Sequence, residues 1–361
     1  MTNSSVDDSD SFASLVILWQ LRHGRHDLPW QNTRDAYRVW LSEIMLQQTQ
    51  VRTVRPYYAR FLDRFPDMQA LAVAPLTSVL ELWSGLGYYA RARHLHHCAQ
   101  TLVHNHAGRF PENLEEIAQL PGIGRSTAAA ITVFAFGKRA AILDGNVKRV
   151  LVRCFAIEGQ PSSARLERQL WELAESLLPD HDIESYSQGM MDLGATICTS
   201  RRPSCDLCPL HAICLARRHN RQAELPPPRQ GKTLPQQRRQ VLLLTDGRQV
   251  LLERRPPLGI WGGLLTLPEG VADDASHFAQ RHGSELLSLG EVCTVRHDFS
   301  HFRLMIDILP CTVRVLGQAA GEDGWQWLAC EQIANAALPT PIRKILFSHL
   351  SPPDQRMLNA K

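Results

Sequence analysis

The feature that most constrains this chain is a glycine-containing turn at residues 120–127, with the sequence Leu-Pro-Gly-Ile-Gly-Arg-Ser-Thr. It separates two segments, 113–120 and 125–136, whose apolar residues favour helices. Glycine allows a tight turn and lets a phosphate approach the amides that open the second helix. The pattern predicts a helix-hairpin-helix with Gly122 and Gly124 in its turn, although a lone Gly-x-Gly is more often an ordinary connection.

A single aspartate follows the second predicted helix. Asp144 stands directly before Gly145 and Asn146. An aspartate before glycine usually forms a turn. Beside a phosphate-binding hairpin, however, such a turn can present an ionised carboxylate to a nucleic acid. The combination predicts a DNA-handling active site.

Four cysteines form a compact group, with six, two and five residues between them: Cys198, Cys205, Cys208 and Cys214. Four thiolates so close in sequence suit zinc or an iron-sulfur cluster, and the spacing alone does not decide. Zinc sites usually pair two Cys-x-x-Cys units, and this chain has one, which favours iron-sulfur. A disulfide framework is the remaining alternative, but nine cysteines and no secretion-like N-terminus suit a reducing compartment.

The remaining cysteines are scattered, and we expect them to be packed or inert: Cys98, Cys154, Cys293, Cys311 and Cys330. The net charge of +3 permits nucleic-acid binding without arguing for it. Basic residues gather near the glycine motifs and the cysteine loop, where we expect phosphates: Arg91, Arg93, Arg201, Arg202, Arg217, Arg218 and Arg221.

Length and patterning indicate two domains. At 361 residues the chain can bury two cores. Before a proline-rich stretch, apolar residues recur at helical spacing in 12–21, 37–48, 79–83, 95–103 and 166–177. After it, short strand candidates lie at 240–244, 249–253, 292–295, 302–308 and 311–315. We predict an all-α domain over 1–225, a linker over 226–236 and a smaller α+β domain over 237–361.

The hairpin, Asp144 and the cysteine loop make the chain resemble the endonuclease III superfamily of base-excision glycosylases, and within it the MutY family. The most specific matches are the segments 28–30, 40–49, 85–93 and 299–301, besides the hairpin. The resemblance implies a Nudix-like C-terminal domain that reads DNA. The glutamate-rich helix that binds magnesium in Nudix hydrolases is missing, because Asp273 and Asp274 are the only acidic residues between Glu269 and Glu285.

The family's chemistry places two carboxylates in this chain. Glu43 lies among apolar residues of a predicted helix, so burial should raise its pKa and keep a proton for the leaving base. Asp144 would stabilise the cationic sugar that forms as the base leaves. The resemblance further implies that Asn146 orients Asp144 or the attacking water, and that Ser126 assists through a hydrogen bond.

The resemblance also implies how the substrate is held. Gln48 and Tyr88 would fill the gap left in the duplex when adenine leaves the stack. The base pocket would comprise Trp30, Gln31, Leu46, Val51 and Gln188. Recognition of 8-oxoguanine on the opposite strand would fall to Phe299, Ser300 and His301.

The resemblance therefore implies an enzyme that removes adenine opposite 8-oxoguanine or guanine in duplex DNA and carries a [4Fe-4S] cluster. Two alternatives stay open. A bifunctional endonuclease III-like enzyme would need a nucleophilic lysine where this chain has Ser126, although Lys148 is nearby and could react adventitiously. A catalytically silent, cluster-bearing DNA-binding module is the other. We further expect a cytoplasmic, nucleoid-associated monomer with no membrane segment and unspecified repair partners.

Overall fold

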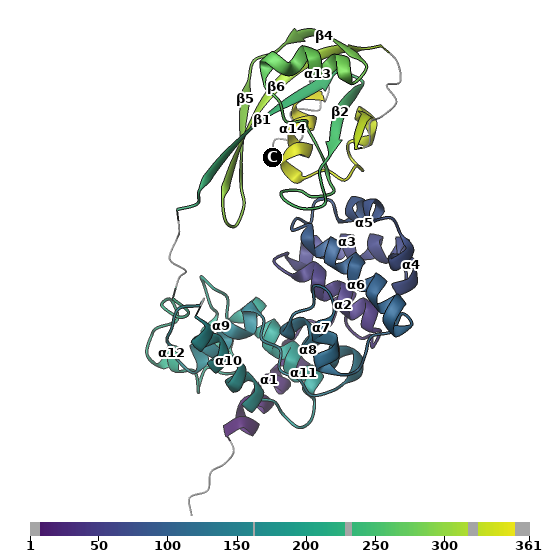
Figure 1. The fold of residues 1–361 in the computed structure, drawn as a ribbon. Helices are drawn as coiled ribbons and strands as arrows, with labels where there is room; N and C mark the ends of the chain where they lie inside the picture. Colours follow the sequence, from purple (N-terminus) through teal and green to yellow (C-terminus); the bar gives the residue numbers. More distant parts are fainter. Residues whose placement is uncertain (1–7, 162, 228–232, 317–323, 351–361) are drawn as a thin grey trace, which may run out of the picture. The chain divides into compact units, whose positions relative to one another are not determined.

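The computed structural model describes residues 8–161, 163–227, 233–316 and 324–350 (Figure 1). The chain folds into two compact units. The first contains residues 1–72 and 97–231, and the second contains residues 73–96 and 232–361. The division therefore passes through the long helix α6 (Ala90–His106) and assigns a part of the helical sequence to the C-terminal unit.

The described part of the first unit is helical. Several helices begin at a residue whose side chain accepts hydrogen bonds from the first free amides, namely Asp35, Asn113, Asp144 and Ser163. Besides most of α6, the helices assigned wholly or largely to this unit are α1 (Asp8–His23), α2 (Ala36–Leu46), α3 (Val51–Arg64), α4 (Met68–Val73), α7 (Leu114–Gln119), α8 (Arg125–Phe136), α9 (Gly145–Cys154), α10 (Ala164–Ser176), α11 (Ile183–Asp192) and α12 (Leu215–Arg218).

Buried side chains around α9 and α8 help to hold this unit together. Around α9, the residues Val147, Val150, Leu151 and Cys154 follow helical spacing and pack with side chains of α1, α10 and α11. Helix α8 is buried on most sides over residues 128–133 and packs against α2, α7 and α11. This central position fixes the hairpin and the residues that follow it.

The second unit contains α5 (Leu76–Trp83) and one seven-stranded sheet in the order β3-β2-β1-β6-β4, with β5 also pairing with β6 and β7 with β2. Its strands are β1 (Gln236–Thr245), β2 (Gln249–Arg254), β3 (Leu265–Thr266), β4 (Ser284–Leu289), β5 (Cys293–Asp298), β6 (Arg303–Val315) and β7 (Trp325–Ala329). Strands β1 and β6 are parallel, and the other pairs are antiparallel.

The sheet is buried on both faces by two helices, α13 (Ala275–Arg281) and α14 (Thr340–Leu350) (Figure 1). Because successive residues of a strand point to opposite faces, Val241 and Leu243 join the core that contains α14, while Leu242 and Leu244 join the core that contains α13. The expected combination of an all-α part with an α+β part is confirmed.

Several boundaries differ from the sequence-based expectation. The candidates at 302–308 and 311–315 form one strand, β6, and strands β3, β4 and β7 were not predicted. Helix α2 ends at Leu46, because the C-cap Gln47 leaves the helical conformation with ψ of 112°, and Gln48 then has a left-handed φ of 57°. The predicted linker already enters β1 at Gln236, and its residues 228–232 lie outside the described ranges. None of the described helices has the length and apolar character of a membrane span.

Candidate active site

A cavity of about 1240 Å³ opens in the first unit between the 20–34 segment, the α2–α3 connection, the start of α9 and helix α11. Most of the predicted site residues of this unit line it. They are Trp30, Gln31, Glu43, Leu46, Gln48, Val51, Asp144, Asn146 and Gln188. The structure therefore gathers both predicted catalytic carboxylates and the predicted base pocket around a single space.

Glu43 is presented to the cavity by α2, between the buried residues Ser42 and Ile44. Burial, followed by the nearby charge of Asp144, raises its pKa from 4.5 to about 7. A pKa near 7 leaves about half of the molecules with the proton in place at neutral pH. Glu43 can therefore act as a general acid.

Asp144 is the N-cap of α9, rather than part of a free turn after the hairpin. Its Oδ1 accepts hydrogen bonds from the amides of Asn146 at 2.9 Å and Val147 at 2.8 Å. Its Oδ2 accepts from the side-chain amide of Asn146 at 2.9 Å. Three N–H donors thus fix the orientation of this carboxylate beside the cavity.

The hairpin itself is formed by α7 and α8, and the predicted bounds of its second helix, 125–136, are confirmed. Gly122 has φ of 74°, and Gly124 is the N-cap of α8. A Cβ at Gly124 would meet nothing within 4 Å, so the space before the helix is open. Ser126 Oγ accepts from the amide of Leu143 at 3.2 Å and supports the residue before Asp144. Gly122, Gly124 and Ser126 do not line the cavity.

Gln188 is held by a buried ionic group formed by Asp192 and Arg25, which was not predicted from the sequence. Its Nε2 donates to Asp192 Oδ1 at 2.8 Å, and Arg25 donates to the same carboxylate from its backbone N at 2.8 Å and its Nε at 2.7 Å. Asp192 is fully buried. A carboxylate within the apolar run around Met190 needs such partners. A buried partner for Asp192 could therefore have been predicted from the sequence, whereas its identity as Arg25 could not.

The pocket residues near α2 and α3 have defined packing. The ring of Trp30 is buried and lies edge-on to Tyr58, with centroids 5.4 Å apart. Gln31 Oε1 accepts from the amide of Leu28 at 3.2 Å. Gln48 is exposed in the α2–α3 connection. The pocket thus combines a fixed aromatic wall with accessible amides.

Tyr88 and Arg91, also named from the sequence, lie in the second unit. Tyr88 is 49% exposed and has φ of 50°. Arg91, expected on a phosphate-facing surface, is instead buried and donates to the carbonyls of Leu86 and Gly87. Its guanidinium lies 5.6 Å from the centre of the Tyr88 ring. Arg91 therefore supports the turn rather than offering its charge to solvent.

Phe299, Ser300 and His301 form the tip of the hairpin between β5 and β6. The amide of Phe299 donates to Phe302 O at 2.9 Å, and the two rings stack with centroids 4.5 Å apart. Ser300 and His301 are exposed between them. Two packed aromatic rings therefore hold a short polar tip.

The cysteine loop packs against the C-terminal half of α9. All four cysteines are free, and Cys198, Cys208 and Cys214 pack on the same core. Buried Arg153 donates from Nη1 to Cys198 Sγ at 3.4 Å and to the carbonyl of Thr199 at 2.6 Å. Within the described ranges, no three His, Cys, Asp or Glu side chains converge closely enough to hold one metal ion.

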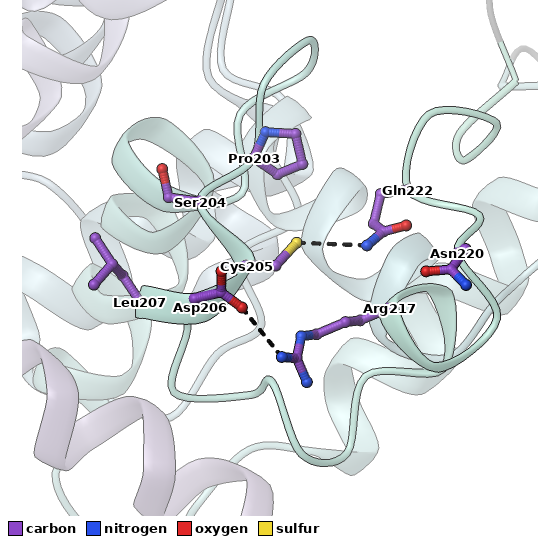
Figure 2. Close-up of a pocket in the computed structure, with 8 residues that line it drawn as sticks. All are labelled: Pro203, Ser204, Cys205, Asp206, Leu207, Arg217, Asn220 and Gln222. Atoms are coloured by element: carbon purple, nitrogen blue, oxygen red, sulfur yellow. Dashed lines mark hydrogen bonds and ion pairs between the residues drawn. The ribbon is translucent and has the colours of Figure 1, made fainter.

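Cys154 is packed in the core, as expected. A hydrogen bond from Cys154 is the largest effect that lowers the pKa of the Cys214 thiol, whereas burial raises the pKa of the Cys198 and Cys208 thiols. Cys205 lines a hollow of about 640 Å³, and Gln222 Nε2 donates to Cys205 Sγ at 3.8 Å. Figure 2 shows the residues around this hollow. The donors from Arg153 and Gln222 to the sulfur atoms suit a loop whose cysteines bind a cofactor as thiolates.

Comparison with known proteins agrees with this architecture. Residues 41–176 match the profile described as HhH-GPD superfamily base excision DNA repair protein, and residues 240–347 match the NUDIX domain. A structure described as a thermostable thymine-DNA glycosylase has a TM-score of 0.53 and 31% identity, covering 58% of this chain and 97% of that chain. The fold and the site define a helix-hairpin-helix DNA glycosylase.

Full-length relatives narrow the assignment. The chain is 36% identical over 337 residues to the adenine DNA glycosylase of Buchnera aphidicola subsp. Baizongia pistaciae, covering 93% of this chain and 95% of that protein. It is 34% identical to the Homo sapiens adenine DNA glycosylase, covering 94% of this chain and 74% of that protein. The chain belongs to the adenine DNA glycosylase family.

Proposed function

We propose that this glycosylase removes adenine opposite 8-oxoguanine or guanine in duplex DNA by hydrolysing the N-glycosidic bond. The observation that carries the proposal is the pair of carboxylates at one cavity. Glu43 has a pKa raised by burial, while Asp144 is fixed by three N–H donors. Loss of a base from deoxyribose needs both a proton donor and a negative charge.

Glu43 is the proton donor in this mechanism. Adenine leaves poorly as an anion, and protonation at N7 makes it a neutral leaving group. A carboxyl with a pKa of about 7 can deliver that proton near neutral pH and then accept one from the attacking water. This exchange lets one residue serve both halves of the reaction.

Asp144 stabilises the sugar. As the bond to adenine breaks, positive charge develops on the deoxyribose, and a carboxylate held in place lowers the free energy of that state without reorganising. Both Asp144 oxygens already accept hydrogen bonds, which supports a fixed electrostatic role. Asn146 supplies one of these bonds and is therefore a positioning residue.

Gln188 supplies base recognition. Asp192 engages the donor end of the Gln188 amide, and the acceptor end suits the exocyclic amine of adenine. Trp30 offers an aromatic wall, with Gln31, Leu46 and Val51 completing the pocket. We assign Gln48 and Tyr88 to the gap in the duplex, and Ser300 and His301 to the opposite base.

The hairpin and the cysteine loop hold the DNA in this proposal. The open space before Gly124 admits a backbone phosphate to the first amides of α8. Cys198, Cys205, Cys208 and Cys214 would hold a [4Fe-4S] cluster through their thiolates. The cluster would stiffen the loop, while the chemistry of base removal stays with the carboxylates.

One assay tests the function. The purified protein is incubated with a duplex carrying adenine opposite 8-oxoguanine, and strand breaks are scored with and without alkali. We expect breaks after alkali only, since alkali cleaves at an abasic site. Breaks without alkali would indicate a bifunctional enzyme, and no breaks in either arm, with binding retained, would indicate a silent DNA-binding module.

A further inference from the structure

The turn that carries Tyr88 has an unusual concentration of left-handed backbone. Gly85, Gly87 and Tyr88 have φ values of 103°, 74° and 50°. Glycine adopts such values readily, but a tyrosine does so at a cost in free energy and keeps them only where its surroundings hold the chain. The groups that hold this turn therefore determine where the exposed Tyr88 ring points.

Part of the support is local. Trp83 Nε1 donates to the carbonyl of Gly87 at 3.2 Å, and Arg91 Nη2 donates to the same carbonyl at 3.2 Å. The amide of Gly85 donates to the hydroxyl of Tyr89 at 3.3 Å. These bonds all lie within residues 83–91, so they do not attach the turn to the rest of the unit.

The anchor comes from the C-terminal sequence, which belongs to the same compact unit. The carbonyl of Leu338 accepts from Ser84 Oγ at 2.9 Å and from the hydroxyl of Tyr89 at 3.1 Å. A single carbonyl thus binds both ends of the turn. Close by in sequence, Arg93 Nη1 donates to the carbonyl of Gly262 at 2.9 Å.

Arg343 joins the two sides. This residue of α14 donates from Nη2 to Ser84 Oγ at 2.7 Å and to the carbonyl of Ala336 at 2.7 Å. Its Nη1 donates to the carbonyls of Ile333, at 3.3 Å, and Ala334. One guanidinium therefore shapes the 333–338 loop and contacts the first residue of the Tyr88 turn, and its planar fork suits several acceptors at once.

We propose that Arg343 is a positioning residue for Tyr88. Arg343 orders the 333–338 loop, whose Leu338 carbonyl accepts from Ser84 and Tyr89, and it also donates directly to Ser84. Together these bonds fix the 84–89 turn in the strained conformation that presents Tyr88 to DNA. The proposal rests on the assignment of Tyr88 to the gap in the duplex. It gives the Nudix-like part a second task besides contact with the opposite base.

The test compares Arg343→Gln with Arg314→Gln, an exposed arginine of β6 that pairs with Glu285. The full-length protein is mixed with a duplex in which 2-aminopurine flanks the adenine, so that opening of the stack raises the fluorescence. We expect the rate of the fluorescence rise and single-turnover excision to fall about tenfold in Arg343→Gln, as loss of a charged hydrogen bond implies. Arg314→Gln should match the parent.

A second pair of variants separates positioning from general damage. In a Tyr88→Ala background, Arg343→Gln should add less than about a twofold further loss, because its effect passes through Tyr88. Equal effects of Arg343→Gln with and without Tyr88, or a parent-like Arg343→Gln, would overturn the proposal. If Arg343→Gln does not fold, Ser84→Ala allows the same comparison with and without Tyr88. If the parent protein opens the stack but does not excise adenine, that result contradicts the proposed function and leaves the role of Arg343 standing.

Discussion

Arg149 donates a hydrogen bond from Nη2 to Oδ1 of Asn146 at 3.0 Å, one helical turn along α9. The same guanidinium donates to the carbonyls of Gly194 at 2.6 Å and Cys198 at 2.7 Å. Since Asn146 in turn donates to Asp144, hydrogen bonds link the proposed catalytic carboxylate to the backbone that leads into the cysteine loop.

Replacement of Arg149 should therefore slow the chemistry more than it weakens DNA binding. We expect Arg149→Gln to reduce single-turnover excision by about tenfold, because Asn146 loses a charged partner. Lys148→Gln is the matched control, since Lys148 on the same helix pairs with Glu167 instead. A parent-like rate at saturating enzyme would show that Asn146 holds Asp144 unaided.

Glu43→Gln should abolish adenine release while mismatch binding persists, because glutamine keeps the shape but has no acidic proton. It should also alter stability. The folded-state pKa of Glu43 is raised to about 7, so folding takes up a proton between about pH 4.5 and 7, and stability falls as pH rises through that window. Above it, Glu43→Gln should be about 1 to 3 kcal/mol more stable than the parent.

Urea unfolding at pH 8 and pH 5 checks this second expectation. The stability gap between variant and parent should narrow at pH 5, where the folded protein already holds the proton. A gap independent of pH would mean that Glu43 titrates alike in the folded and unfolded chains. Excision by the parent should correspondingly decline above about pH 7.

Ser126→Lys should introduce strand cleavage. Ser126 Oγ lies against the amide of Leu143, next to Asp144, so a longer side chain carrying an amine could reach toward the sugar. Borohydride trapping of a covalent protein–DNA adduct detects attack by the new lysine. The parent protein is the control, because Lys148 could produce a background of trapped adduct. If Ser126→Lys gives no more trapped adduct than the parent, position 126 is not equivalent to the position of the nucleophilic lysine in the bifunctional relatives.

Cys205→Ser should lose bound iron and visible absorbance, and with them solubility or DNA binding. Cys330→Ser is a suitable control, because Cys330 lies in the second unit and outside the four-cysteine loop. Iron and acid-labile sulfide are measured in protein purified without oxygen. Stoichiometric zinc without iron in the parent would refute the cluster assignment.

Ser300→Ala combined with His301→Ala should reduce preference for the lesion. The two exposed side chains at the β5–β6 tip can each give one hydrogen bond, worth about 1 to 3 kcal/mol together. The ratio of excision efficiencies opposite 8-oxoguanine and opposite guanine is measured below saturation. A ratio unchanged by the double substitution would leave the tip with a structural role.

Local patterns predicted much of this molecule. The bounds of α8 were predictable because Gly124 opens it and Gly137, with φ of 65°, closes it. Glu43 and Asp144 could be selected because each lies in a motif of its own. Strand β4 was missed because the sequence Ser-Glu-Leu-Leu-Ser-Leu does not alternate, and β3 because it has two residues.

Long-range pairs escaped prediction for a different reason. Arg25 and Asp192 are 167 residues apart, and no local pattern relates a loop arginine to a particular buried carboxylate. The same holds for Arg343 with Ser84 and for Gln222 with Cys205. Such contacts depend on how whole elements pack, so their partners become visible only in three dimensions.

The two side chains assigned to the gap in the duplex, Gln48 and Tyr88, both stand on left-handed backbone. Glycine at either position would relieve about 1 kcal/mol of conformational strain, yet would remove the group that meets the DNA. Selection for thermal stability alone would therefore favour glycine at both positions. In a library of variants selected for heat resistance, glycine should replace Gln48 and Tyr88 early, and adenine excision should fall. In a library selected for adenine excision, Gln48 and Tyr88 should be retained although they are less stable.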